Sequence, residues 1–75
     1  MTINEIDKNS KEKIRVSIEE FRGHRFIDCR VYFADDAGAW HPTKKGIALN
    51  SECISDVIQA LQQANKALAE VKVHG

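Results

Sequence analysis

Residues able to bind a nucleic acid gather between positions 40 and 49, where an aromatic ring and a proline precede two lysines and a glycine. The sequence there reads Trp40-His41-Pro42-Thr43-Lys44-Lys45-Gly46-Ile47-Ala48-Leu49. A flat ring can stack on an unpaired base while nearby lysines meet the phosphates, and sequence-tolerant binding of a single strand requires both contacts. The same residues are also typical of a core tryptophan followed by a solvated hairpin turn. The stretch therefore has two interpretations, a strand-binding site and an ordinary turn.

Catalytic and metal sites find little support in the sequence. The adjacent acids Asp35-Asp36 and Glu19-Glu20 point to opposite sides of an extended backbone, which is poor geometry for paired acid-base chemistry. The three histidines are far apart, and no pair of Cys or His has the spacing of zinc ligands. We therefore expect a binding protein rather than an enzyme, with no metal and no cofactor.

Length and charge narrow the class of protein. The chain has 75 residues with 11 basic and 11 acidic side chains, so its formal net charge is zero. A basic excess occurs only in residues 13–46, which carry seven Lys or Arg against five Asp or Glu. This excess permits nucleic-acid binding without requiring it. A single domain this short buries only about 60% of its unfolded surface, so association with a second copy is the expected route to stability.

The compartment is expected to be reducing. No apolar signal stretch precedes the two cysteines, so both thiols are expected to be reduced. No apolar run approaches the roughly 20 residues that span a bilayer. We expect a cytoplasmic protein without a membrane partner, associated with the nucleoid if the host is prokaryotic.

The pattern of apolar residues predicts an α+β fold, with a four-stranded antiparallel β-meander followed by one long C-terminal α-helix. Residues 1–12 are polar and are expected to form a flexible N-terminal arm, which leaves residues 13–75 as the single domain. Apolar residues alternate from Ile14 and again through residues 26–33, with a tight turn between them in which Gly23 takes a positive φ. This pattern predicts an antiparallel hairpin.

Two further short strands are expected after the hairpin. Residues 39–42 and 47–49 are the candidates, and Lys44-Lys45-Gly46 is the turn expected between them. Pro42 lacks an N–H donor, so its strand is expected at an edge of the sheet.

One helix is expected from about residue 51 to residue 72, with Asn50 as its N-cap. Apolar residues recur on one face at spacings of three and four, which is typical of a helix with a buried stripe. Because the helix is long for so small a domain, part of the stripe is expected to contact a second chain, and the alternative is that it covers the protein's own sheet. The expected dimer contacts are Leu61, Leu68 and Val71.

Three segments resemble the single-stranded-DNA-binding domain of the positive-cofactor-four transcriptional coactivator family. They are Arg15-Val16-Ser17-Ile18-Glu19-Glu20-Phe21-Arg22-Gly23, Ile27-Asp28-Cys29-Arg30-Val31-Tyr32-Phe33, and residues 40–50. The resemblance covers roughly residues 13–62, and the most specific part is the Lys-Lys-Gly-Ile stretch after a proline. Because the serine-rich arm of the eukaryotic members is absent, the chain looks like a short prokaryotic or phage member.

The resemblance implies a dimer whose curved sheets present two ridges to single strands. By position, Phe21 and Phe33 resemble the base-stacking aromatics of the family. The residues that resemble its backbone-contacting cations are Arg22, Arg30, Lys44 and Lys45. Trp40 and His41 complete the predicted site. Because His41 replaces a common lysine, weaker and pH-sensitive binding is expected.

Two aromatic residues remain ambiguous at this point. Strict alternation places Phe33 on the core face with Ile27 and Val31, whereas the resemblance requires its ring to be available to bases. Trp40 is a candidate for base stacking, for covering a dimer edge, or for core packing.

Two functions are therefore carried forward. The first is a dimeric single-stranded DNA-binding protein in transcription, as a coactivator-like protein, or in replication or repair, which holds unpaired strands by stacking and by Lys or Arg contacts to the backbone. RNA binding and a partner in the transcription machinery stay open under this function. The alternative is a protein–protein interaction module that uses the same sheet–helix dimer without nucleic acid.

Overall fold

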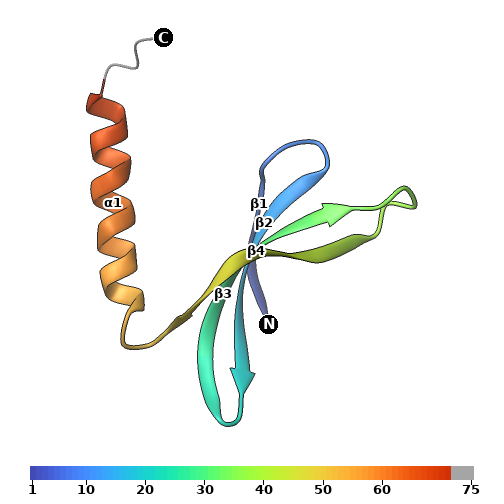
Figure 1. Ribbon diagram of the computed structural model, residues 1–75, viewed down its shortest axis with the longest axis horizontal. Helices are drawn as coiled ribbons and strands as arrows, with labels where there is room; N and C mark the ends of the chain where they lie inside the picture. The colour runs from blue at the N-terminus through green and yellow to red at the C-terminus, as the bar shows by residue number, and fades with distance from the viewer. Residues whose placement is uncertain (72–75) are drawn as a thin grey trace.

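The fold is a twisted four-stranded antiparallel sheet followed by one helix, as the computed structural model shows for residues 1–71 (Figure 1). The elements are β1 (Thr2–Asp7), β2 (Glu12–Phe21), β3 (His24–Ala34), β4 (Trp40–Asn50) and α1 (Ile54–Glu70). The strands lie in the order β1-β2-β3-β4, so each pairs with its neighbour in sequence. The predicted fold class, a meander followed by a helix, is confirmed, although β1 was not expected and β4 takes the place of two expected short strands.

The central hairpin follows directly from the sequence. β2 and β3 pair without interruption from Glu12↔Phe33 to Phe21↔His24. The two residues between them have positive φ angles, 53° at Arg22 and 78° at Gly23. Positive φ at both central positions is characteristic of a type I′ turn, whose twist matches that of the flanking strands. The expected positive φ at Gly23 is confirmed, and Arg22 shares it.

The N-terminal segment forms a strand, where the sequence led us to expect a flexible arm over residues 1–12. β1 pairs with β2 as an edge strand, and the Met1 ammonium donates a hydrogen bond of 2.8 Å to the Ile18 carbonyl. Cross-strand contacts hold a polar strand in place, because Ile6 lies opposite Ile14 and Glu5 lies opposite Arg15. Composition within the segment could not reveal these partners, since they lie about ten residues away along the chain.

β4 is one strand of 11 residues, where two short strands and a turn were expected. The Lys44-Lys45-Gly46 segment does not turn the chain. Instead, the register between β3 and β4 shifts, from Arg30↔Gly46 on one side to Tyr32↔Pro42 on the other. Three residues of β4 therefore face one residue of β3, so the segment forms a β-bulge. The expectation that Pro42 lies in an edge strand is confirmed, because β4 is at the end of the sheet.

The helix begins later than expected. Its N-cap is Cys53, which makes no side-chain capping bond, so Asn50 is not the N-cap. The Asn50 side-chain oxygen instead accepts hydrogen bonds of 3.0 Å from the backbone N–H groups of Glu52 and Cys53, which shapes the turn before the helix. The helix ends at Glu70, and Lys72, expected in its last turn, lies outside the described residues. Within residues 1–71, no helix has the length and hydropathy to cross a bilayer.

The sheet has one apolar face and one mixed polar and aromatic face. Register and alternation place the apolar residues of β1 to β4 on one side, and this apolar face comprises Ile6, Ile14, Val16, Ile18, Ile27, Cys29, Val31, Ile47 and Leu49. The opposite side, called the polar face below, comprises Glu5, Lys13, Arg15, Ser17, Glu19, Phe26, Asp28, Arg30, Tyr32 and Trp40.

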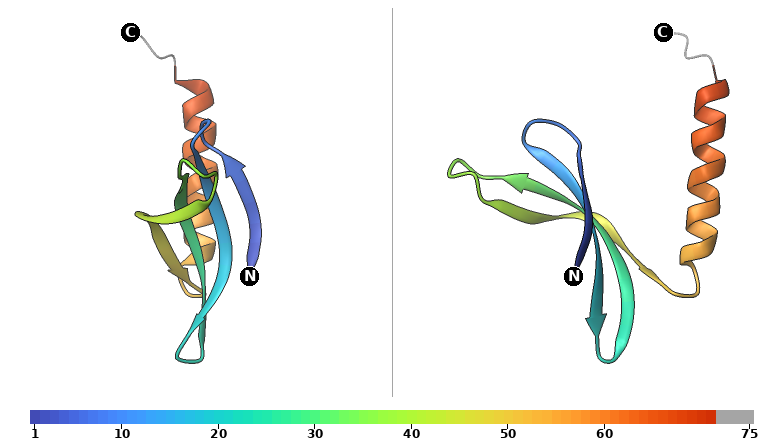
Figure 2. Two further views of the ribbon diagram at one scale, coloured as in Figure 1. Left: turned by 90° about the vertical axis from the view of Figure 1, so that its right-hand side faces the viewer. Right: turned by 180° about the vertical axis from the view of Figure 1, so that it is seen from behind.

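No closed core forms within residues 1–71 of the single chain. Leu49 is the only buried hydrophobic residue in the described part of the chain, and no residue of α1 is buried. Figure 1 and the right-hand view of Figure 2 show the helix standing beside the sheet instead of lying on it. The radius of gyration is 15.0 Å, whereas a compact domain of this length has about 11 Å. The helical stripe therefore does not cover the sheet of its own chain.

Candidate nucleic-acid interface

The two lysines of the predicted site lie in the bulge of β4, called here the lysine bulge (Thr43, Lys44 and Lys45). The Thr43 hydroxyl donates a hydrogen bond of 2.7 Å to the Val31 carbonyl and accepts one of 3.1 Å from the Lys45 N–H. A single side chain thus satisfies two backbone groups that the interrupted ladder leaves unpaired. Both lysines are exposed. The bulge therefore presents two cations to solvent on a backbone that Thr43 holds in shape.

Arg30 fastens the lysine bulge from the neighbouring strand. Its guanidinium makes two hydrogen bonds of 3.0 Å to the two carboxylate oxygens of Asp28 and donates a third, of 2.9 Å, to the Thr43 carbonyl. The Asp28 contact raises the pKa of Arg30, so the group is cationic throughout the physiological range. The sequence predicted a backbone-contacting cation here, and the structure shows that most of its donors are already engaged within the chain.

Gly46 is required by this arrangement, although its φ is ordinary. A Cβ at this position would lie 2.8 Å from the Cys29 carbonyl oxygen, 2.9 Å from Arg30 Cζ and 3.0 Å from Arg30 Cα. Carbon atoms in favourable contact are about 3.5–4.0 Å apart, so an added side chain would displace the guanidinium or separate the strands. The glycine of the Lys-Lys-Gly motif is therefore explained by the close approach of Arg30.

Phe33 and His41 lie opposite each other near the outer end of the β3–β4 hairpin. Their ring centroids are 5.5 Å apart with an interplanar angle of 39°. Because the β2–β3 register is unbroken, Phe33 stays on the apolar face, as alternation predicted. It is nevertheless 42% exposed, because the sheet has few neighbours at this end. Strand alternation thus places the Phe33 ring on the apolar face, and its exposure leaves it available to a ligand.

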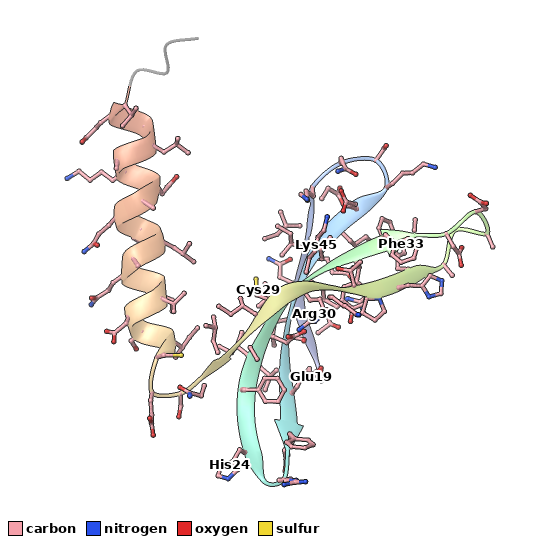
Figure 3. All side chains as sticks on the ribbon, viewed as in Figure 1. Glu19, His24, Cys29, Arg30, Phe33 and Lys45 are labelled. Atoms are coloured by element: carbon pink, nitrogen blue, oxygen red, sulfur yellow. The ribbon has the colours of Figure 1, made fainter. Side chains whose placement is uncertain are left out.

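The lysine bulge belongs to the same half of the sheet as Phe33 (Figure 3). The pKa of Glu12 is lowered mainly by its hydrogen bond from Asn9, then by the charge of Lys8, and Lys45 adds a smaller electrostatic contribution. Glu12 pairs directly with Phe33 across the β2–β3 ladder. This half of the sheet therefore combines an exposed ring with the exposed cations of the lysine bulge.

His41 is held by an acid of the β3–β4 loop. Its Nε2 lies 2.6 Å from Asp35 Oδ2, while Asp35 Oδ1 accepts hydrogen bonds of 2.9 Å from the backbone N–H groups of Ala37 and Ala39. The hydrogen bond with His41 is the largest of the effects that lower the pKa of Asp35. The carboxylate therefore neutralises part of any charge on the imidazole, and this position is a weaker cation than a lysine would be.

A second aromatic and basic group lies at the opposite end, around the β2–β3 hairpin. Phe21 is 63% exposed, and the Arg22 guanidinium carbon lies 5.1 Å from the centre of its ring. A surface hollow of about 610 Å³ lies beside them. Its lining is Phe21, Arg22, His24, Arg25, Phe26, Ala48, Asn50, Ser51 and Glu52. Phe26 was not among the predicted site residues, although its alternation in β3 placed it opposite the core.

Trp40 is half-buried on the polar face, where the Lys13 ammonium lies 4.1 Å from the centre of its ring. Beside it, the Arg15 guanidinium lies 3.9 Å from the centre of the Tyr32 ring. Glu5 of β1 contacts both cations, at 2.7 Å from Arg15 and 3.6 Å from Lys13. The β3–β4 register and these contacts place the Trp40 ring on the polar face, at the outer end of the edge strand β4.

A known protein family matches the part of the chain that contains these segments. The profile of the Transcriptional Coactivator p15 (PC4) family matches residues 8–60, which is well over half of the chain. The chain belongs to the PC4 family. PC4 is a DNA-binding family without catalytic activity, and the resemblance noted from the three segments is thereby confirmed.

Solved structures of PC4 homologues share the fold of this chain. The PC4 homologue BPSL1147 from Burkholderia pseudomallei K96243 is 35% identical and superposes with a TM-score of 0.81 in its orthorhombic form, over 87% of this chain and 88% of that one. In its tetragonal form the TM-score is 0.82, over 87% and 96% of the two chains. The bacteriophage T5 homologue, implicated in recombination-dependent DNA replication, is 25% identical, with a TM-score of 0.73 over 92% of this chain and 80% of that chain.

Within this PC4-family chain, the predicted site residues form two groups, with Arg30 and Trp40 apart from both. Phe33, His41 and the lysine bulge share the β3–β4 half of the sheet, and Phe21 and Arg22 form the tip of the β2–β3 hairpin. Arg30 lies between these ends, and Trp40 lies on the polar face. Six further residues position these side chains through their contacts, and none of the six was among the predicted site residues. They are Glu5, Lys13, Arg15, Asp28, Tyr32 and Thr43. Alternation in β2 and β3 was the available signal, since it places most of these residues on the polar face.

Proposed function

We propose that the protein is a homodimeric single-stranded DNA-binding protein, which holds unpaired strands by aromatic stacking and by Lys and Arg contacts to the phosphates. The observation that carries the proposal is the lysine bulge, which Arg30 and Thr43 fasten beside the exposed ring of Phe33. Exposed cations beside an exposed ring satisfy both requirements of single-strand binding. Membership of the PC4 family supports the same ligand.

The proposed dimer rests on what the single chain leaves uncovered. Ile18 and Ile47 on the apolar face are 37% and 54% exposed, and Leu61 and Leu68 on the helix are 64% and 67% exposed. Soluble monomers rarely leave contiguous apolar surface of this kind open to water. A second copy offers both a helix stripe and a sheet face, and so covers the two surfaces in one assembly with twofold symmetry. Val71, 61% exposed, is the third residue proposed for this interface.

Dimerisation would also join binding groups that one chain holds apart. Phe21 and the lysine bulge lie in opposite halves of the long sheet. Two chains together provide two copies of each group, and simultaneous engagement raises the affinity for one strand far above that of either group alone. The role we infer is protection or presentation of unpaired strands in replication, recombination or repair, as the implication of the T5 homologue in recombination-dependent DNA replication suggests. A coactivator-like role in transcription is the proposed alternative setting for the same chemistry.

The decisive experiment compares single-stranded and duplex oligonucleotides of one sequence by fluorescence anisotropy at several salt concentrations. We expect the single strand to bind more tightly, because its bases are available for stacking, worth about 1–3 kcal/mol per base. Duplex binding of equal or greater strength would contradict the proposal. Absence of binding to either DNA would favour the alternative of a protein–protein interaction module.

Two variants separate charge from stacking in the same assay. Each phosphate neutralised contributes about 0.7 to the log–log dependence of affinity on salt for single strands. Replacing Lys44 and Lys45 by Ala is therefore expected to lower this slope by up to about 1.4 per chain. Phe33→Ala is expected to weaken binding with little change of slope. If Phe33→Ala instead unfolds the protein while the slope of the lysine variant stays unchanged, the assignment of both groups is wrong.

A further inference from the structure

A cluster on the polar face joins four strands through two cations and two rings. In this cluster the Lys13 ammonium lies over the Trp40 ring, the Arg15 guanidinium lies over the Tyr32 ring, and Glu5 bridges the two cations. We call Lys13, Trp40, Arg15 and Tyr32 the cation–aromatic ladder. Phe33 and the lysine bulge do not belong to it. Together with Glu5 of β1, its residues come from all four strands, so the cluster exists only in the folded sheet.

The chemistry of the ladder is that of a nucleic-acid site. A guanidinium stacked on a ring is suited to phosphates and to the faces of bases, and an ammonium over an indole is a favourable cation–π contact. The ladder lies on the same face as Arg30, because Arg15 and Arg30 are directly opposite each other in β2 and β3. A strand that follows this face would therefore meet the ladder without leaving the sheet.

Glu5 contacts both cations of the ladder and is the anion that pairs with them. Its carboxylate accepts a hydrogen bond of 2.7 Å from Arg15 Nε, the kind of charge-assisted contact that Arg makes with carboxylate and phosphate alike. This bond is the largest cause of the lowered pKa of Glu5, so the carboxylate keeps its negative charge at neutral and mildly acidic pH. Its side chain is still 33% exposed, so it can be displaced without unfolding β1.

We propose that the ladder is a second binding subsite for the phosphates and bases of a single strand, and that Glu5 competes with the strand for Lys13 and Arg15. The inference rests on the proposed function, since the ligand is the same single strand. Phe33 lies on the apolar face, so the ladder adds contacts on the opposite face of the sheet, next to Arg30. Glu5 in this arrangement limits affinity, because a bound strand must replace an internal anion that is tethered next to both cations. Removing its charge frees two cations for phosphate contacts.

The test is Glu5→Gln, studied with labelled single-stranded oligonucleotides over a range of salt concentrations. We expect tighter binding and a steeper salt dependence, by up to about 1.4 in slope for two freed cations, which is up to about 25-fold in affinity at about 0.1 M salt. Trp40 is the single tryptophan of the chain, so its emission reports on the ladder directly. Oligonucleotide is expected to change this emission more in Glu5→Gln than in the wild type.

Three control variants distinguish competition from a structural effect. Glu5→Asp keeps the negative charge but shortens the reach to Arg15, so it loosens the contact without raising the slope. Glu70→Gln changes the net charge equally at an exposed position at the end of the helix and is expected to bind as the wild type does. Glu5→Gln combined with Arg15→Gln is expected to lose most of the gain.

The outcomes separate this inference from the proposed function. If the wild type binds single strands and Glu5→Gln binds with the same slope, the ladder is structural and the inference is overturned. It is equally overturned if Glu5→Asp matches Glu5→Gln, or if the gain survives the loss of Arg15. If the wild type binds no strand and only Glu5→Gln does, the ladder stands and the proposed function of the wild-type protein fails. If neither binds, both are refuted.

Discussion

Gly46→Ala tests most directly how the lysine bulge is held. The added methyl would lie within 3.0 Å of three atoms, two of which belong to the backbone of Cys29 and Arg30. Moving the guanidinium relieves only the contact with Arg30 Cζ, and it would break the bonds to Asp28 and to the Thr43 carbonyl. The methyl is therefore expected to push β3 and β4 apart at the bulge.

The expected size of the effect follows from overpacking. Forcing an extra methyl into a close contact costs about 1–3 kcal/mol in free energy of unfolding. In a domain of this length each kcal/mol shifts the melting temperature by about 4–8 °C, so a loss of at least about 4 °C is expected. Because Lys44 and Lys45 depend on the same backbone, single-strand affinity and its salt slope are expected to fall together.

Circular dichroism melts and the anisotropy titration, both at one fixed protein concentration, measure the two effects. Ala48→Ser is the matched control, because it adds one atom to β4 at an exposed position two residues away. We expect this control to melt and to bind as the wild type does. A Gly46→Ala protein with wild-type stability and wild-type affinity would refute the argument that Arg30 and Gly46 shape the bulge.

Two further predictions concern acid stability and assembly. Because the pKa of Asp35 is lowered in the folded protein, mainly by His41, its contribution to stability is complete above the ordinary Asp pKa of about 3.9 and disappears as the pH falls through the lower folded value. In thermal melts between about pH 6 and about pH 2, acidification should lower the melting temperature of Asp35→Asn less than that of the wild type. Equal decreases in melting temperature would contradict this. Leu68→Asp buries a charge in the proposed dimer contact and should shift sedimentation from about twice the 8.5 kDa chain mass toward monomer. Gln59→Asp, on the opposite helix face, should stay dimeric, and a wild type that sediments as a monomer would overturn the dimer.

Local patterns in the sequence were sufficient for the central hairpin and the helix. Alternating apolar residues in β2 and β3 fix which side chains share a face, because the side-chain period of a strand is two. The same rule placed Phe33 on the apolar face correctly, and the glycine at position 23 marked the hairpin turn. That Leu61 and Leu68 share one helix face likewise follows from the helical period, whereas Val71, expected in the helix, lies just past its end in an extended conformation.

Long-range pairing could not be derived in the same way. β1 is a strand because Ile6 meets Ile14 and Glu5 meets Arg15, and nothing within residues 1–12 specifies those partners. A proline followed by Thr-Lys-Lys-Gly satisfies the local rules for a turn, which is why the turn was expected. The Thr43 hydroxyl and the Arg30 guanidinium instead satisfy the backbone of an uninterrupted strand.

The sequence by itself determined the family, the central hairpin, the presence of a C-terminal helix and the residue types available for binding, because these depend on periodicity and on motifs within a few residues. Only the tertiary structure decided which cations are free and which are occupied. Arg30 is engaged by Asp28 and Thr43, and Lys13 and Arg15 by Glu5, whereas Lys44 and Lys45 are held out toward solvent. The physical reason is that a charge is neutralised by whatever the fold brings within a few ångströms of it, and that distance is set by strand register rather than by separation along the chain.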